Sequence, residues 1–160
     1  MENRAAIYIL CLAALAGCDR GWAYRVPNAT PLTFADRRQA YEVISPDHTR
    51  LQIDASLWLG TVRVRLEVSN VGDEPLVIDA QSLAIFRGTE QLQPGAPAPI
   101  RCDEPDQGKL VLEPGHSCRI RAGFHAPQSE AKLRDLRLLY RGAMRGKQEV
   151  VIDALLKKID

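Results

Sequence analysis

The chain lacks an excess of charge of either sign. Its 160 residues include 21 lysines and arginines against 20 aspartates and glutamates, a formal net charge of +1. Binding to nucleic acid requires a clear basic excess to neutralise phosphates, so we expect no nucleic-acid partner. The chain also lacks an apolar run of about 20 residues, the length that a membrane-spanning helix needs, which excludes a multi-span membrane protein.

The sequence also lacks the short motifs of several enzyme classes. It contains no Gly-x-Ser-x-Gly, no Gly-rich phosphate loop and no His-Glu-x-x-His. The three histidines are scattered along the chain, and a general base needs a positioned partner that the sequence does not show. What is present, 46% hydrophobic and 26% charged residues, is ordinary for one domain that buries a core. We therefore expect a non-catalytic domain without a cofactor. An envelope hydrolase is an alternative that no motif favours.

The N-terminus carries a short apolar segment. Residues 5–17 contain no charge and follow Arg4. Thirteen residues are too few to span a bilayer but fit the apolar region of a secretory signal. The segment ends Leu15-Ala16-Gly17-Cys18, with small residues before a cysteine. This pattern resembles the lipobox of bacterial lipoproteins.

The resemblance implies a lipid anchor. Signal peptidase II would cut between Gly17 and Cys18, and Cys18 would carry diacylglycerol on its thiol, which makes the lipid bilayer a partner. Asp19 then resembles the signal that retains lipoproteins in the inner membrane, with the outer membrane as the alternative. The expected organisation is a signal peptide at 1–17, a lipidated tether at 18–40 and a domain at 41–160.

Two aromatic residues lie in the expected tether. Pro27 and Pro31 interrupt any helix in this segment, and no periodicity holds there. Trp22 and Tyr24 follow the lipidated cysteine closely. Amphipathic rings are favoured at the level of the lipid headgroups, so these two residues are expected either there or packed on the domain.

From residue 50 onward, apolar and polar residues alternate with a period of two. Val62, Val64, Leu66 and Val68, for example, alternate with polar or charged residues, which predicts a strand with one face in a core. Short helical turns are possible only at 36–44 and 128–135. Seven to eight short antiparallel strands separated by turn residues favour a β-sandwich. The predicted strands are 51–57, 62–68, 76–78, 83–86, 110–112, 118–124, 136–140 and 150–154.

Two turn motifs carry a second resemblance. Asn70-Val-Gly-Asp-Glu-Pro-Leu-Val-Ile is followed by Leu112-Glu-Pro-Gly-His-Ser and by a strand that ends at Phe124. Over residues 50–156 this order is similar to that of bacterial immunoglobulin-like envelope modules. The resemblance implies an immunoglobulin-like sandwich. Because sandwiches host many functions, it implies only a binding or scaffold role with an envelope protein as partner.

Two of the four cysteines remain for the exported domain. Cys11 lies in the signal and Cys18 is expected to be lipidated, which leaves Cys102 and Cys118. An even pair in an oxidising compartment favours a disulfide, here closing a loop of fifteen residues. The alternative is metal handling by His116, Cys118 and His125, with or without Cys102. No pair of these residues has the usual spacing of zinc ligands, so the disulfide is favoured and no metal is expected.

Arginine is far more abundant than lysine. Arg63 and Arg65 are predicted to point outward from one strand, and Arg119 and Arg121 from another. If both pairs share one sheet face, they form a basic patch suited to anionic lipid or an envelope polyanion. The alternative is a solvated face with acidic neighbours such as Glu67. Further arginines follow near the C-terminus, at Arg134, Arg137, Arg141 and Arg145.

Overall fold

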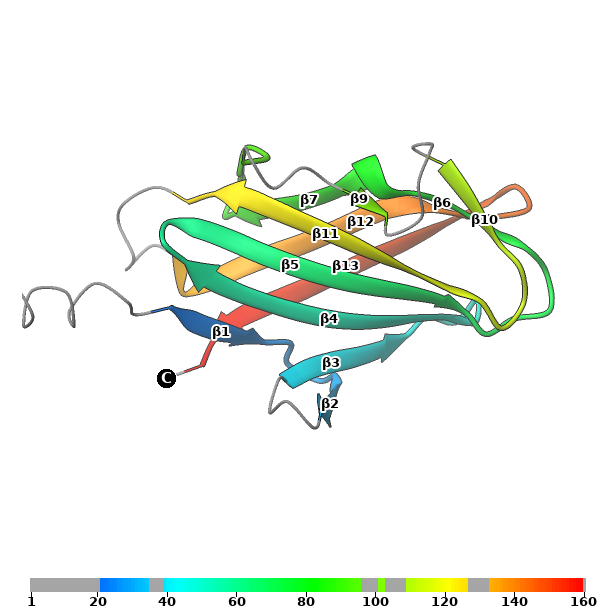
Figure 1. The fold of residues 1–160 in the computed structure, drawn as a ribbon, viewed down its shortest axis with the longest axis horizontal. Helices are drawn as coiled ribbons and strands as arrows, with labels where there is room; N and C mark the ends of the chain where they lie inside the picture. Colours follow the sequence, from blue (N-terminus) through cyan, green and yellow to red (C-terminus); the bar gives the residue numbers. More distant parts are fainter. Residues whose placement is uncertain (1–20, 35–38, 96–100, 103–108, 127–132, 160) are drawn as a thin grey trace, which may run out of the picture.

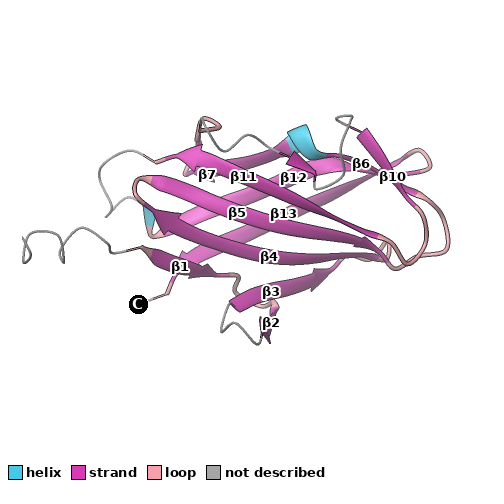
Figure 2. Cartoon of the chain, viewed as in Figure 1, coloured by secondary structure: helices cyan, strands magenta, loops and turns pink. Residues whose placement is uncertain are grey.

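The computed structural model describes residues 21–34, 39–95, 101–102, 109–126 and 133–159. The described chain folds into two antiparallel sheets that face each other, as Figure 1 shows. The predicted fold class, an all-β antiparallel sandwich, is confirmed. Figure 2 shows that strands dominate and that turns cluster at the two ends.

The described residues form more strands than the seven to eight predicted. Each predicted strand exists, and the additional strands are short pieces at the sheet edges. One 3₁₀ turn, η1 (Ala80–Ser82), interrupts the strands. In chain order the thirteen strands are β1 (Trp22–Arg25), β2 (Thr30–Thr33), β3 (Gln39–Ile44), β4 (Thr49–Trp58), β5 (Thr61–Asn70), β6 (Leu76–Asp79), β7 (Leu83–Arg87), β8 (Glu90–Gln91), β9 (Arg101–Cys102), β10 (Lys109–Leu112), β11 (Ser117–His125), β12 (Asp135–Arg145) and β13 (Gln148–Lys158).

The first sheet contains the longest uninterrupted hairpin of the chain. β4 pairs with β5 along ten register positions, from Thr49 opposite Asn70 to Trp58 opposite Thr61. β11 pairs with the other edge of β5, and β9 pairs with β11. β3 pairs with the remaining edge of β4 and with β2. This order places β4, β5, β11 and β9 side by side, with one shared outer face.

The second sheet is built around β12 and β13. These two strands pair with each other, and the other edge of β12 is shared by β7 and β6. β10 extends the sheet beyond β6, and β8 pairs with β7. β1 joins the two sheets, because Trp22 lies opposite Leu57 of β4 while Tyr24 lies opposite Lys158 of β13. One short strand therefore closes one side of the sandwich.

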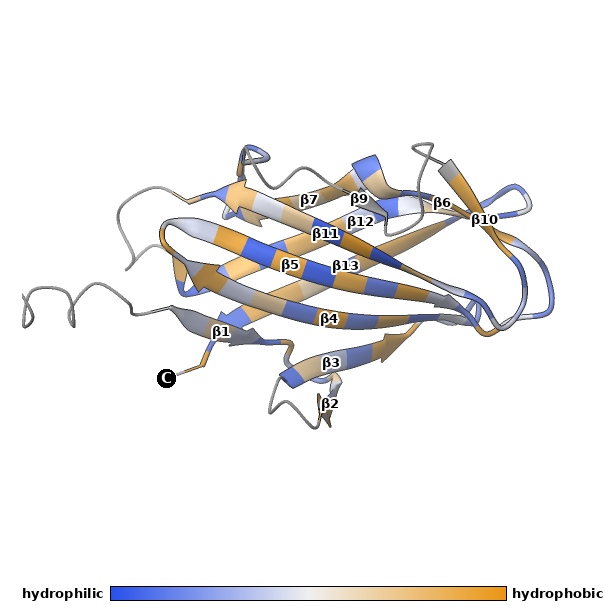
Figure 3. Cartoon of the chain, viewed as in Figure 1, coloured by the Kyte–Doolittle hydropathy of each residue, from blue (hydrophilic) through white to orange (hydrophobic). Residues whose placement is uncertain are grey.

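The core follows from the alternation of residues along the long strands. In β4 and β5 every second side chain is buried, and Leu51, Ile53, Val62 and Leu66 are among those fully or almost fully buried. Figure 3 shows the resulting alternation of hydrophobic and hydrophilic residues along these strands. Side chains of adjacent residues in a strand point to opposite faces, so one set packs between the sheets and the other faces outward.

The tether expected at 18–40 is wrong from Trp22 onward. Trp22–Arg25 and Thr30–Thr33 are strands, and Tyr24 is only 2% exposed. The Tyr24 hydroxyl donates a hydrogen bond to the Leu133 carbonyl oxygen at 2.9 Å. Tyr24 is therefore a core residue rather than a headgroup residue. Pairing with β4 and β13 supplies the backbone hydrogen bonds of this segment, which no local sequence pattern could indicate.

Two further local predictions need correction. The segment 36–44 was expected to permit a helical turn, but Gln39–Ile44 is a strand paired with β4. The strand predicted to end at residue 140 instead continues to Arg145, with a β-bulge where the register shifts between Tyr140 and Ala143. Gly142 permits this bulge, since a Cβ there would lie 2.1 Å from the Asp79 carbonyl oxygen.

Candidate functional site

Four arginines share the outer face of the first sheet. Arg63 and Arg65 lie on β5, Arg119 and Arg121 lie on β11, and all four are exposed. The register puts Arg65 directly opposite Arg121 and puts Arg119 opposite Glu67. The arginine pairs of β5 and β11 therefore share one sheet face, which is what a basic patch requires. We call the outer face that carries these residues the arginine face.

Two like charges lie side by side on this face. Along one register line Asp54 of β4, Arg65 of β5 and Arg121 of β11 follow one another. Neighbouring strands lie about 4.8 Å apart, and like charges directly opposite each other are unfavourable in a sheet. We call Arg65 and Arg121 the arginine row. Only Asp54, at one end of the line, is an acidic residue.

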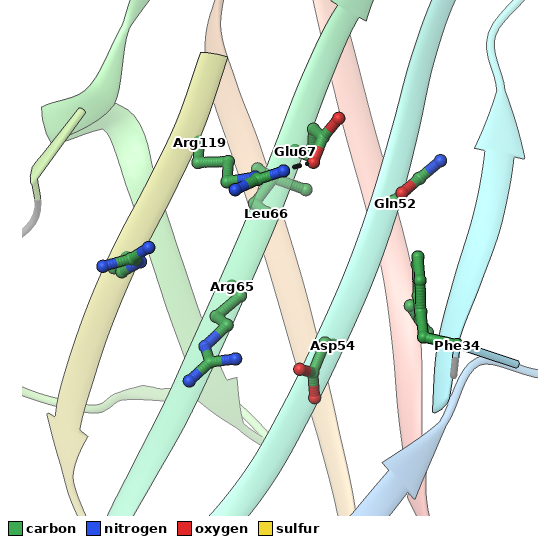
Figure 4. A pocket seen from close by; sticks show the side chains of 9 residues that line it. Phe34, Gln52, Asp54, Arg65, Leu66, Glu67 and Arg119 are labelled. Carbon is green, nitrogen blue, oxygen red and sulfur yellow. Dashed lines mark hydrogen bonds and ion pairs between the residues drawn. The ribbon is translucent and has the colours of Figure 1, made fainter. Parts of the chain in front are cut away.

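The neighbouring register line has mixed charge. Gln52 lies opposite Glu67, and Arg119 lies on the other side of Glu67 with 2.9 Å between its Nε and the Glu67 carboxylate. Figure 4 shows this pair beside Arg65 and Asp54. The Arg119 side chain is 62% exposed, so this ion pair contributes less than about 1 kcal/mol to stability. The arginine face is thus basic along one line and balanced along the next.

A shallow pocket opens on the arginine face. Its volume is about 80 Å³, far below the several hundred Å³ of a typical metabolite site. The Phe34 ring stands at one side of it, and the side chains of β4, β5 and β11 form its floor and far side (Figure 4). A pocket of this size accommodates one side chain of a partner rather than a whole metabolite. Its lining consists of Phe34, Ala40, Gln52, Asp54, Arg65, Leu66, Glu67, Arg119 and Arg121.

Sequence reasoning found the arginines of this pocket but missed its other side. Gln52 and Asp54 occupy outward positions of a correctly predicted strand, so the alternation already contained a signal for them. Phe34 had no such signal. It comes after β2, a strand that the sequence did not indicate, and reaches the pocket only because β2 and β3 pair beside β4.

The C-terminal arginines do not join the arginine face. Arg137 lies on the exposed side of the second sheet and donates a hydrogen bond from its Nε to Asp153 at 2.7 Å. This bond lowers the pKa of the Asp153 carboxyl below its usual range. Arg145 instead reaches a turn, where it donates to the Asn70 Oδ1 at 2.9 Å. Arg134 precedes β12 and Arg141 is exposed on β12 of the second sheet.

The residues expected to carry the lipid anchor, Gly17, Cys18 and Asp19, lie outside the described residues. Cys118 is buried in β11, only 4% exposed. Cys102 lies in β9 opposite Ile120, two residues along β11 from Cys118. The two cysteines therefore belong to paired neighbouring strands.

The alternative metal site is not assembled. His116 precedes β11 and His125 ends it, so the two histidines are separated by about 30 Å of extended strand. Cys118 lies next to His116 and far from His125, with its side chain in the core. Over the described ranges, no group of three or more histidine, cysteine, aspartate or glutamate residues is placed to hold a metal. The metal-handling hypothesis that combined His116, Cys118 and His125 is therefore wrong.

The clear pKa shifts among the described groups lie away from the pocket. Burial raises the pKa of Tyr24 and that of Tyr140, both of which are core residues. The Arg137 and Asp153 pair on the second sheet accounts for the others. Among the described residues, no helix has the length and apolar character to cross a bilayer.

Comparisons with known proteins give no family. No family model matches the chain. No curated protein matches it. Two similar solved structures are yeast domains. The GAE domain of yeast GGA1 is 12% identical, with 76% of this chain and 99% of that chain covered and a TM-score of 0.44. The GAE domain of GGA2p from Saccharomyces cerevisiae is 7% identical, with 76% and 97% covered and a TM-score of 0.37. No functional residue is carried over from either.

Proposed function

We propose that the chain is a membrane-anchored envelope lipoprotein whose sandwich is a non-catalytic binding module. Its binding surface is the arginine face, and its partner is an acidic segment of another envelope protein. The observation that carries this proposal is the arginine row, in which Arg65 lies directly opposite Arg121.

The arginine row favours a ligand over a merely solvated face. A solvated face is most stable when opposite charges alternate across the strands, as Glu67 and Arg119 do. The arginine row departs from this arrangement, because Arg65 and Arg121 occupy directly opposed positions on the outer face. An acidic partner segment that lies along the row would contact both, since guanidinium groups bind carboxylates bidentately.

The pocket adds a specific contact to this electrostatic attraction. Phe34 supplies an apolar side, while Arg65 and Arg121 supply guanidinium groups on the other sides. A partner side chain with an apolar stem and an acidic end, such as glutamate, matches this lining. Complementary charge would mainly increase the association rate, and the pocket would then select the register of the bound segment.

The anchor is proposed from the sequence. Leu15-Ala16-Gly17-Cys18 supports cleavage after Gly17 and attachment of diacylglycerol to Cys18. Asp19 supports retention at the periplasmic face of the inner membrane, and the outer membrane is the alternative. A single acyl chain gives only marginal anchoring, so the several chains of a mature lipoprotein matter physically.

We also propose a disulfide between Cys102 and Cys118. Its support is the pairing of β9 with β11, in which the two cysteines are offset by two residues on adjacent strands. A disulfide would hold the two-residue strand β9 to the sheet. Closing a loop of fifteen residues stabilises a fold by about 3 kcal/mol in the chain-entropy model.

Intact mass of the membrane-extracted protein tests both covalent proposals. The mass is measured with and without thiol alkylation. We expect a chain that begins at Cys18, carries acyl mass and takes up alkyl groups only after reduction. A chain with an unmodified N-terminus would overturn the anchor. Alkylation of Cys102 and Cys118 before reduction would overturn the disulfide.

Titration with poly-L-glutamate tests the arginine face. The protein in detergent is titrated while the fluorescence of Trp58 is followed, because Arg63 lies over its ring at 5.9 Å from the centroid. Replacing Arg65 and Arg121 together by glutamine should weaken binding about tenfold, which corresponds to about 1.4 kcal/mol. Arg137→Gln, on the other sheet, is the matched control and should leave binding unchanged. Equal affinity of the double variant and the control would refute the proposed surface.

Photo-crosslinking in cells tests the class of partner. A benzophenone side chain at position 119 lies on the arginine face, while the same group at Val151, which is 47% exposed, lies on the second sheet. We expect a discrete protein adduct from position 119 and none from position 151. The same adducts from both positions would mean that the arginine face has no specific protein partner.

A further inference from the structure

The tip of the β4–β5 hairpin carries an exposed leucine. Leu59 and Gly60 connect the two strands, and the Leu59 side chain has the highest exposure of the large hydrophobic residues among the described ranges, at 73%. Both residues have positive φ, 45° for Leu59 and 72° for Gly60. This is the two-residue turn in which both φ values are positive, where asparagine, aspartate and glycine are strongly preferred.

Leucine is therefore the wrong residue for the turn by local criteria. An L-residue with a bulky side chain in the left-handed region costs about 1–2 kcal/mol, because its Cβ crowds the following carbonyl oxygen. Exposing the same side chain to water gains nothing in the isolated domain. A residue that is unfavourable both for its backbone and for its exposure points to a function at this position.

The surroundings of Leu59 combine aromatic and basic side chains. Trp58 precedes it, and Arg63 lies over the Trp58 ring. Trp22 of β1 lies on the same end of the sandwich, and the Lys158 ammonium stands 4.2 Å from the centroid of its ring. Trp22 and Trp58 are the only two tryptophans of the chain. We call Leu59, Trp58, Trp22, Arg63 and Lys158 the hairpin end.

The hairpin end is also where the described chain begins. Gly21 packs directly on Trp58, since a Cβ at Gly21 would lie 2.7 Å from the ring. Figure 1 shows that β1 begins at the same end of the sandwich as the β4–β5 turn. Two residues lie between Cys18 and Gly21, so their Cα atoms are at most about 11 Å apart in a fully extended chain. An acyl group on Cys18 would thus hold the hairpin end within about 11 Å of the lipid anchor.

We propose that the hairpin end docks on the bilayer, with Leu59 inserted at the boundary between headgroups and acyl chains. The inference rests on the proposed lipidation of Cys18. The occupant is a bilayer that contains anionic phospholipid: tryptophan rings are favoured at this depth, and Arg63 and Lys158 match the headgroup charge. The long strands would then stand away from the membrane and leave the arginine face open to a partner beside it.

The two native tryptophans report on this contact without a label. The lipidated protein is reconstituted into vesicles of phosphatidylethanolamine and phosphatidylglycerol, with or without lipids brominated high on the acyl chains. We expect bromine to quench the tryptophan emission. Leu59→Asn suits the turn and leaves the anchor intact, and it should reduce this quenching about twofold, because the apolar side chain no longer inserts. Val111→Thr, which alters an exposed aliphatic residue of β10, is the matched control.

The outcomes separate this inference from the proposed anchor. Intact mass of the same sample establishes whether Cys18 is acylated, and circular dichroism establishes that each variant is folded. Acylated protein whose tryptophans are not quenched would overturn the docked hairpin end while the anchor stands. Equal quenching of Leu59→Asn and the unaltered protein would overturn the role of Leu59. Absence of acylation would overturn the proposed anchor, and the docking inference with it.

Discussion

Replacing Asn70 by alanine removes the centre of a hydrogen-bond network at the other end of the sandwich. Asn70 is fully buried at the end of β5. Its Nδ2 donates to the carbonyl oxygens of Glu74 at 2.8 Å and Leu112 at 2.9 Å. Its Oδ1 accepts from the Gly72 amide at 3.1 Å and from Arg145 at 2.9 Å. The side chain thus joins two turns that are about forty residues apart.

The expected loss follows from these four bonds. A typical intramolecular hydrogen bond contributes about 1 kcal/mol net, and a buried group left without a partner costs about 1–3 kcal/mol. Arg145 keeps its hydrogen bond to the Glu74 carbonyl oxygen, whereas the Leu112 carbonyl oxygen loses a partner in a buried site. Asn70→Ala should therefore lower the free energy of unfolding by about 3–4 kcal/mol. Asn70→Asp should be at least as damaging at neutral pH, because its carboxylate would face both carbonyl oxygens.

Urea unfolding followed by tryptophan fluorescence measures this loss. Both tryptophans lie at the opposite end of the sandwich, so a shifted midpoint reports on the whole domain rather than on the altered turn. Ser69→Ala is the control, because Ser69 is adjacent in the chain but points to the outer face. It should change stability by no more than about 0.5 kcal/mol. A loss below about 1 kcal/mol for Asn70→Ala would refute the assignment of the network as a structural centre.

Three further predictions concern single positions. Gly142→Ala should lower the free energy of unfolding, measured by thermal denaturation, by more than about 3 kcal/mol, because the new Cβ would overlap a backbone carbonyl oxygen. Gly115→Ala is the control: the space around Gly115 is open, so the loss should be only about 1 kcal/mol. Leu59→Asn should raise the free energy of unfolding by about 0.5–1 kcal/mol, because asparagine suits the positive φ at this position. A lower free energy of unfolding for the variant, measured with urea, would contradict the strain at the hairpin end. Arg137 lowers the pKa of Asp153, so the ionised pair stabilises the fold above the ordinary carboxyl pKa, and this stabilisation is lost as the pH falls through the lowered pKa. Arg137→Gln should therefore make the free energy of unfolding less dependent on pH in the acid range. An unchanged pH dependence of stability in the variant would contradict this prediction.

The long strands could be predicted from the sequence because their signal is local. Alternation of apolar and polar residues specifies which face of β4, β5 and β11 is buried, whatever the neighbouring strand is. The short strands β1, β2 and β3 have no such signal. They form because the edge of β4 offers backbone partners, which only the folded sheet provides.

The candidate site divides in the same way. Alternation predicted that Arg63, Arg65, Arg119 and Arg121 would point outward, but it could not place one strand beside another. The pairing of β5 with β11 decided that Arg65 lies opposite Arg121. The metal hypothesis could be rejected with the same local signal, since the predicted strand 118–124 already separates His116 from His125.

The sequence by itself therefore determined the sandwich class, the faces of the long strands and the residues from which a lipid anchor is inferred. Tertiary structure alone decided which strands are neighbours, where Phe34 meets the arginines, and that the hairpin end lies next to the start of the described chain. The physical reason is that side-chain direction along a strand repeats with a local period of two, whereas strand pairing depends on backbone hydrogen bonds between segments far apart in the chain.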